Sequence, residues 1–378
     1  MRFKEIIGQQ EVKDHVIKTV RENRISNTQL FWGSEGTGGL ALAIAYAQYL
    51  NCLAPLDDDS CGECDSCMKN AKLVHPDLHF SYPFNLPKSD PNSRSTDFLV
   101  KWREAVLGNP YLNYHTWLQK LEIENKQGNI TALECRDIIK RLSLKPYEGK
   151  YKILIMWLPE FLGNEGNILL KLLEEPSSNT VIILVTQDKD RVLNTILSRT
   201  QILHINRIND VDIKNALINL HDLTEDEAQR IVFLSEGNYH KAQVLIQDVE
   251  DNNQTLFRGW LRLCFERKGG ELVSYVNDLA KIGRERQKQF LNYGLSIIRE
   301  CILINNGVNQ IGRVEGDVLD FVQKLSQFVH EANQKEIMEE FNKACFHIER
   351  NGNPKIVFLD LSIKMGELLK VENVSLQT

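Results

Sequence analysis

Four cysteines, at positions 52, 61, 64 and 67, lie within sixteen residues of one another and could bind a metal ion. Thiolates at Cys-x2-Cys spacing suit tetrahedral Zn²⁺, and four of them close its coordination sphere, so the ion would be structural. An iron–sulfur cluster is the main alternative, but no further cysteine followed by proline comes shortly downstream. A redox dithiol needs fewer cysteines. We predict a zinc site formed by Cys52, Cys61, Cys64 and Cys67, with His75 and His79 as spare candidate ligands.

A glycine-rich segment, residues 33–39, follows a short apolar run and precedes a helix-forming run rich in Ala and Leu. Strand, glycine loop and helix in this order are typical of a phosphate-binding loop. Gly39, however, replaces the expected lysine, and Leu40 replaces the serine or threonine that would hold Mg²⁺. The backbone amides of such a loop could still bind an anion. The alternative is a glycine-rich turn without a binding function. We predict a degenerate loop, made by Gly33, Gly36, Gly38 and Gly39, and do not expect this chain to bind ATP.

The acidic pair that normally accompanies such a loop is also missing. It would end a buried strand in the same sheet, and residues 152–157 form a continuous β-type run of this kind. Trp157 and Leu158 stand where Asp and Glu would be, and Glu160 lies beyond a proline. These losses favour a chain that does not hydrolyse ATP.

The elements that must position these residues alternate between strands and helices up to residue 206. Strands are predicted at 29–32, 78–82, 152–157, 181–186 and 201–205, and helices at 9–22, 40–47, 131–144 and 164–175. This alternation predicts an α/β domain with a mostly parallel sheet over residues 1–206, which carries the cysteine module (52–67) and an extra segment of about 83–128. Helices at 209–220, 224–235 and 239–248 predict a small helical domain over 207–250. Residues 251–378 remain helical and form the predicted third domain.

The composition of the chain excludes some classes of function but does not identify one. The chain has 378 residues, with 45 Lys and Arg against 51 Asp and Glu, and its net charge of −6 argues against strong autonomous binding to DNA. No long apolar run or secretion signal is visible, so a cytoplasmic protein is expected. Structural disulfides are therefore not expected. The isolated cysteines, at 135, 264, 301 and 345, are predicted to be buried packing residues.

Several motifs in order along the chain resemble one known family. They are Gly8-Gln9-Gln10, the glycine loop, the cysteine module directly after the next helix, His75-Pro76-Asp77, Leu170-Lys171-Leu172-Leu173-Glu174-Glu175-Pro176 and Leu197-Ser198-Arg199-Thr200. Together they look like the clamp-loader subunits of bacterial DNA polymerase III, which belong to the AAA+ class of P-loop-type proteins. The degenerate loop is similar to that of the delta prime branch rather than to that of the ATP-hydrolysing gamma/tau branch.

The resemblance implies an AAA+ domain, a small helical lid and an all-α collar that forms oligomers. It implies a subunit without intrinsic ATPase activity in the polymerase holoenzyme, which assembles with gamma/tau and delta subunits to load the sliding clamp on primed DNA. Contact with the clamp would be indirect, and contact with primer–template DNA weak or indirect. It also implies that Arg199 is an arginine finger for a neighbouring ATP site, although Thr200 replaces the family's cysteine.

Two more positions differ from the residues typical of the active members of this family. Gln187 stands where active members often have a polar sensor, and His240 replaces the arginine of the small helical domain. We expect His240 to lie on a helix surface. Two alternatives remain at this stage: an active gamma/tau-like ATPase with unusual site residues, and a zinc-containing scaffold or adaptor unrelated to replication.

Overall fold

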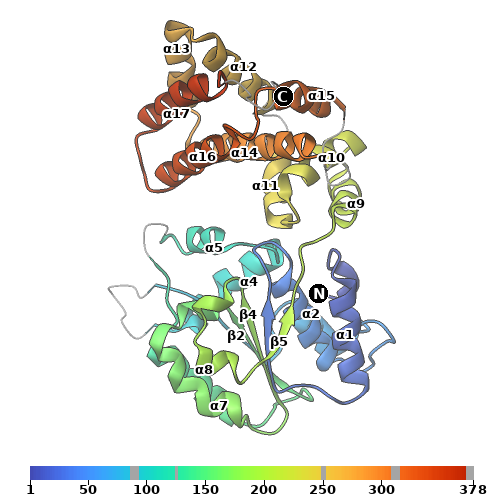
Figure 1. Cartoon of the computed structure of the whole chain (residues 1–378). Coiled ribbons are helices and arrows are strands. Elements are labelled where there is room, and N and C mark those ends of the chain that lie inside the picture. Colours follow the sequence, from blue (N-terminus) through green and yellow to red (C-terminus); the bar gives the residue numbers. More distant parts are fainter. Residues whose placement is uncertain (86–92, 124–126, 248–252, 308–315, 372–378) are drawn as a thin grey trace. The chain divides into compact units, whose positions relative to one another are not determined.

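The computed structural model describes residues 1–85, 93–123, 127–247, 253–307 and 316–371. The chain folds into two compact units, residues 1–245 and 246–378, and each is described by itself (Figure 1). The division into three domains with boundaries at 206 and 250 stays a prediction. No helix among the described residues combines the length and the apolar character needed to cross a membrane.

The first unit is built on a five-stranded sheet, which confirms the predicted α/β class. All neighbouring strands are parallel, in the order β2-β3-β4-β1-β5. The strands are β1 (Thr28–Trp32), β2 (Leu78–Ser81), β3 (Lys152–Trp157), β4 (Thr180–Thr186) and β5 (Gln201–His204). Strands β3 and β4 are buried along their whole length, as their unbroken apolar sequences predict.

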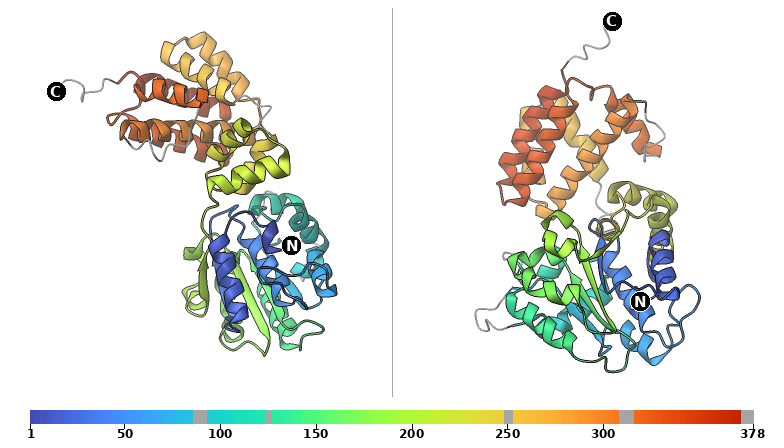
Figure 2. Two further views of the ribbon diagram at one scale, coloured as in Figure 1. Left: turned by 90° about the vertical axis from the view of Figure 1, so that its right-hand side faces the viewer. Right: turned by 60° about the horizontal axis from the view of Figure 1, so that its bottom comes forward.

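Helices cover both faces of this sheet (Figure 2). Alternate strand residues such as Leu30, Leu154 and Ile182 form one core with α6 and the segment after β3. Helix α2 is buried along nearly its whole length and contacts β1, β3 and β4. The helices of this part are α1 (Gln10–Arg21), α2 (Gly39–Leu50), α3 (Asp65–Ala71), α6 (Ala132–Ser143), α7 (Leu170–Glu174) and α8 (Asn194–Leu197), with 3-10 turns η1 (Phe3–Glu5), η3 (Pro159–Phe161), η4 (Gly163–Leu169) and η5 (Lys189–Arg191).

The single helix predicted over 164–175 is only partly correct. Its first half is the 3-10 segment η4, and only the second half is the α-helix α7. Gly163 adopts φ +53° and Gly166 follows three residues later. Glycine is a poor α-helix former, which accounts for the looser first half.

The extra segment forms a lobe with a turn and two helices, η2 (Ser95–Phe98), α4 (Leu99–Gly108) and α5 (Tyr114–Lys120). Residues 86–92 and 124–126 of this segment lie outside the described residues. Trp102 and Trp117 are fully buried, and the Trp117 indole donates to the carbonyl oxygen of Pro83 at 2.7 Å. The lobe is therefore a folded part of the first unit.

Helices α9 (Asp210–His221), α10 (Glu225–Ser235) and α11 (Tyr239–Gln247) follow the sheet. The described part of the second unit is helical, as predicted, with an aromatic core that includes Phe257, Trp260, Phe290 and Phe341. Its helices are α12 (Asn253–Glu266), α13 (Gly269–Leu279), α14 (Arg284–Asn305), α15 (Gly316–Ser326), α16 (Gln334–Glu349) and α17 (Pro354–Leu368).

Candidate functional site

The glycine loop connects β1 to α2 in the way its sequence predicts. Gly36 and Gly38 have φ values of +71° and +90°, which only glycine adopts readily. The N–H of Gly33 donates to the carbonyl oxygen of Thr186 on β4 at 3.2 Å, and the Thr37 hydroxyl donates to the carbonyl oxygen of Ser34 at 2.7 Å. The loop thus has a fixed turn at the carboxyl edge of the sheet, where parallel sheets bind ligands.

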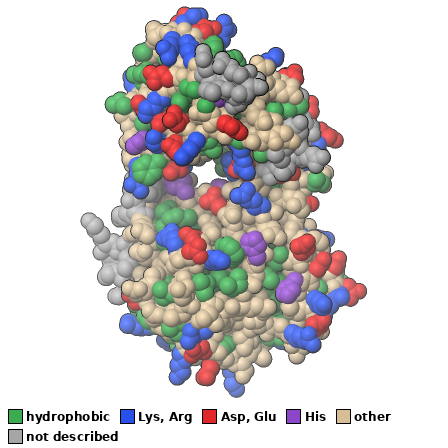
Figure 3. Space-filling view, viewed as in Figure 1, with side chains coloured by type: hydrophobic (Ala, Val, Ile, Leu, Met, Phe, Trp, Pro, Cys, Tyr) green, Lys and Arg blue, Asp and Glu red, His purple; other side chains and the backbone are tan. Residues whose placement is uncertain are grey.

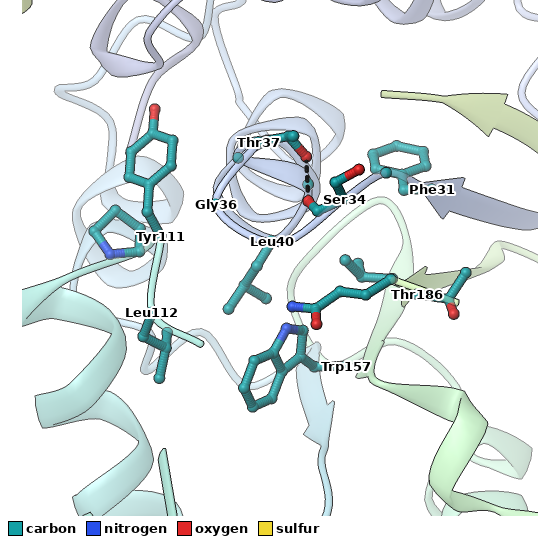
Figure 4. A pocket seen from close by; sticks show the side chains of 15 residues that line it. Phe31, Ser34, Gly36, Thr37, Leu40, Tyr111, Leu112, Trp157 and Thr186 are labelled. Carbon is teal, nitrogen blue, oxygen red and sulfur yellow. Dashed lines mark hydrogen bonds between the residues drawn. The ribbon is translucent and has the colours of Figure 1, made fainter. Parts of the chain in front are cut away.

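A hollow of about 340 Å³, open solvent included, lies at this loop (Figure 4). Glycines and apolar side chains, including Leu40, Leu112 and Trp157, make up most of its lining. None of the described lining residues is charged; the polar ones are Ser34, Thr37, Tyr111, Thr186 and Gln187. A triphosphate would therefore meet no lysine or arginine among the residues that line this hollow.

The end of β3 shows what stands in place of the acidic pair. Trp157 is buried in the lining of the hollow, and Leu158 is buried beside it. Glu160 is also buried, but its carboxylate accepts from the Thr186 hydroxyl at 2.8 Å and from the N–H of Gln187 at 3.1 Å. Burial raises the pKa of Glu160. This carboxyl group braces the end of β4 and is not in the lining of the hollow.

His240 does not lie on a helix surface, so that expectation was wrong. Only 8% of its surface is exposed. Its ring Nδ1 lies 3.3 Å from the side-chain nitrogen of Asn109, and its Nε2 lies 3.5 Å from the Thr116 hydroxyl. Both partners belong to the extra lobe, which the sequence pattern did not connect with this position.

The four clustered cysteines come together as their spacing predicts. Their sulfur atoms all lie within 4.8 Å of one another, and the Sγ of Cys61 is 3.5 Å from that of Cys52 and 3.8 Å from that of Cys67. Tetrahedral zinc with bonds of about 2.3 Å places its sulfur ligands about 3.8 Å apart. The donor set and its geometry therefore fit zinc.

Backbone N–H groups support the thiolates. The N–H of Cys64 donates to the Sγ of Cys61 at 3.4 Å, and the N–H of Cys67 donates to the Sγ of Cys64 at 3.5 Å. Hydrogen bonds from the backbone at Glu63 and Cys64 lower the pKa of Cys61 to about 6. Burial raises the pKa of Cys67, and a bound cation would offset that cost.

The spare histidines are not part of this cluster. In the part of the chain that the structure describes, the grouped metal ligands are the four cysteines alone. His75 is buried, and its Nδ1 accepts from the N–H of Asp77 at 3.2 Å. The Asp77 carboxylate accepts from three consecutive N–H groups, at 147–149. The His-Pro-Asp motif therefore ties down the loop before β3.

Arg199 follows α8 and lies on the surface, with 31% of its side chain exposed. Its Nε donates to the Glu174 carboxylate at 2.5 Å, and Nη2 forms an ion pair with the same carboxylate. Its Nη1 donates to the carbonyl oxygen of Thr195 at 2.8 Å. Arg199 is thus held by its own chain and does not line the hollow at the glycine loop.

Sequence reasoning missed the residues that cover the glycine loop. Tyr111 comes from the extra lobe and Asn238 from the turn before α11, and both contact loop glycines. The segment around Tyr111 carries no motif that points to this position, and its aromatic character does not specify a partner. The segment around Asn238 carries the family pattern in which His240 replaces an arginine, but that pattern was interpreted as a helix surface.

Comparison with known proteins identifies related sequences. Residues 8–209 match the family described as DNA polymerase III, delta subunit. The DNA polymerase III subunit delta' of Bacillus subtilis is 23% identical over 334 residues, which cover 86% of this chain and 87% of that protein. The tau subunit of B. subtilis is 21% identical over 374 residues, which cover 97% of this chain and 50% of that protein.

Other similarities are partial or remote. The tau/gamma subunit of Haemophilus influenzae is 24% identical over 225 residues, 59% of this chain and 26% of that protein. The chain thus spans half or less of these tau and tau/gamma relatives. A gamma subunit-related protein of Thermotoga maritima has 14% identity and a TM-score of 0.40, with 94% of this chain and 99% of that chain covered. The fold assignment rests on the sheet topology, not on that similarity.

Proposed function

Because the chain belongs to the DNA polymerase III delta subunit family, we propose that it is a non-catalytic, delta prime-like subunit of a bacterial clamp loader. It assembles with gamma/tau and delta subunits, which supply the ATPase activity and the direct contact with the sliding clamp. The complex loads the clamp on primed DNA. The family match speaks against a zinc adaptor unrelated to replication.

The observation that carries this proposal is the uncharged hollow at the glycine loop. ATP hydrolysis needs a cation on the β- and γ-phosphates and a hydroxyl and carboxylate that hold Mg²⁺. Here Gly39 and Leu40 occupy the loop positions, and Trp157 occupies the strand position. No described residue in the lining replaces the missing charges, and this speaks against the alternative of an active gamma/tau-like ATPase.

Arg199 contributes to the ATP site of a neighbouring subunit in this proposal. An arginine supplied in trans stabilises the charge that develops on the transferred phosphoryl group and is worth roughly 10³–10⁵ in rate in other NTPases. The position of Arg199 outside its own glycine-loop hollow, with its side chain partly exposed, supports a role toward another chain. To reach a neighbour, its guanidinium must share or leave the Glu174 carboxylate.

The test is the ATPase rate of a complex reconstituted with gamma/tau and delta subunits. Arg199→Ala should lower the clamp- and DNA-stimulated rate at least tenfold while the complex still assembles. Arg21→Ala is the matched control, since Arg21 is also partly exposed and ion-paired, with Asp57. An unchanged rate in the assembled Arg199→Ala complex would refute the role in trans.

Glu174→Gln separates the availability of Arg199 from the stability of the fold. Exposed ion pairs contribute about 0–1 kcal/mol, and the Glu174 side chain is 48% exposed. We expect less than about 1 kcal/mol of destabilisation. If the ATPase rate of the complex then changes more than twofold, the change reports the release of the Arg199 guanidinium. If Glu174→Gln does not fold, the small stability contribution assigned to the Arg199–Glu174 ion pair is wrong.

The four cysteines hold a structural zinc ion in this proposal. The cluster closes the loop between α2 and α3, and the Asp59 carboxylate within that loop accepts from the N–H groups of Phe3 at 3.0 Å and Lys4 at 3.1 Å. Zinc bound here would therefore stabilise the N-terminal segment as well as the loop.

DNA contact is weak or indirect in this proposal. Figure 3 shows basic and acidic side chains interspersed over the face that it draws, without a continuous basic area. Neutralisation of phosphates by such a basic area is what drives strong DNA binding. The mild net charge of −6 points the same way.

A further inference from the structure

The extra lobe packs directly against the residue that replaced the catalytic acid. The ring centroid of Trp102 on α4 lies 5.4 Å from that of Trp157 at the end of β3. Trp102 also stacks on Tyr82 at 4.1 Å and meets Trp117 edge-on at 5.1 Å. The loss of the acid and the presence of the lobe are therefore two sides of one packing arrangement.

The turn between α4 and α5, residues 109–113, lies beside the glycine loop and lines the hollow there (Figure 4). The Tyr111 ring touches Gly38 so closely that a methyl group there would come within 2.9 Å of it. The Tyr111 hydroxyl accepts from the N–H of Ile7 at 2.9 Å. The Asn113 side-chain amide donates to Glu35 at 3.2 Å. The turn is thus hydrogen-bonded to the N-terminal segment at Ile7 and to the glycine loop at Glu35.

The residues at the start of α11 close the loop from the other direction. The N–H of Tyr239 donates to the carbonyl oxygen of Gly36 at 3.0 Å. The Asn238 side chain occupies the space beside Gly36 where a methyl group would stand. The Tyr239 ring meets the Tyr111 ring edge-on at 4.9 Å. The turn of the lobe and the start of α11 therefore contact each other as well as the loop.

We propose that residues 109–113 narrow the phosphate-loop site from one side, so that it excludes nucleotide, and hold the start of α11 against the loop. Tyr111 and Asn238 cover Gly38 and Gly36 and so reduce the room for a nucleotide beside the loop. Asn109 contacts His240, and Tyr111 contacts Tyr239. These contacts connect the turn of the lobe to the start of α11 without any ligand. This inference rests on the proposed non-catalytic function and assigns a role to the extra lobe.

The first experiment is a titration of the isolated full-length chain with a fluorescent ATP analogue and Mg²⁺. The unmodified chain should show no saturable binding up to millimolar concentrations of the analogue. Saturable binding with Kd below 100 μM by the unmodified chain would overturn the proposal, because the turn would then not exclude nucleotide.

The second experiment measures amide hydrogen exchange of residues 236–245 in the isolated chain. Tyr111→Ala should speed exchange there at least tenfold and leave α2 and β4 protected. Tyr147→Ala is the matched control, since Tyr147 is 84% exposed, and it should leave exchange unchanged. Unchanged exchange in Tyr111→Ala would overturn the proposal.

A third variant guards against misfolding of Tyr111→Ala. The double substitution Asn109→Ala and Asn113→Ala removes two partly buried side chains of the turn and should produce the same local increase in exchange. Unchanged exchange in this variant would overturn the role of the turn. Since all readouts come from the isolated chain, their failure stays distinct from a failure of the Arg199 test in the complex.

Discussion

Substitution of Gly36 by alanine tests whether the start of α11 is docked on the glycine loop. Gly36 has φ +71°, where a residue with a Cβ atom loses about 1–2 kcal/mol. Gly163 has φ +53°, but a methyl group there would meet nothing within 4 Å. Gly163→Ala should therefore lower the free energy of unfolding by that strain alone, about 1–2 kcal/mol.

Gly36→Ala should cost more because the new methyl group overlaps the Asn238 side chain. If Asn238 moves, it loses the 2.9 Å bond from the N–H of Lys241, which as a helix cap is worth about 0.5–2 kcal/mol. The 3.0 Å bond from the N–H of Tyr239 to Gly36 adds about 0.5–1.5 kcal/mol. The total loss in Gly36→Ala should be about 2–5.5 kcal/mol.

The assay is unfolding in urea, monitored by the hydrogen exchange of peptides from residues 1–245. These peptides report on the first compact unit alone. The predicted signature is a loss in Gly36→Ala that exceeds the loss in Gly163→Ala by about 1–3.5 kcal/mol. Equal losses in the two variants would refute the reasoning, since they would mean that the Asn238 contact contributes nothing.

Two further predictions concern the metal and a partly buried histidine, His79. Elemental analysis should find one zinc ion per chain, Cys64→Ser should lose it and unfold at lower temperature, and the isolated Cys345→Ser should keep it; iron in place of zinc would contradict the assignment. Burial lowers the pKa of His79 to about 4, so the folded chain rejects a proton that an unfolded histidine binds near pH 6.5. Stability should therefore fall as pH drops from about 6.5 toward 4, by up to about 3 kcal/mol. His79→Gln should flatten that part of the stability curve, whereas substitution of the exposed His115 should not.

The sequence predicted the sheet because its central strands are buried on both faces. The apolar runs that became β3 and β4 can be recognised without tertiary information. The cysteine cluster was predictable for a related reason, since its four ligands come from one short stretch. The glycine loop was predictable as a turn between strand and helix.

The closure of the loop was not predictable in this way. The contact between Asn109 and His240 joins residues 131 positions apart. Neither residue belongs to a periodic pattern, and a histidine on a helix is compatible with an exposed or a buried site. Only the folded lobe determines which applies, and for this reason the expectation for His240 was wrong.

The aromatic packing of Trp157 has a consequence for how this protein could change in evolution. An aspartate at position 157 would place a carboxylate beside the Trp102 indole, where it would be buried without a counter-ion, at a cost of several kcal/mol. Restoring Lys and Ser in the loop would still leave Tyr111 and Asn238 against Gly38 and Gly36. Each of these single substitutions is therefore penalised on its own. In this fold, an ATP-hydrolysing site would need the lobe, the loop and the strand to change together.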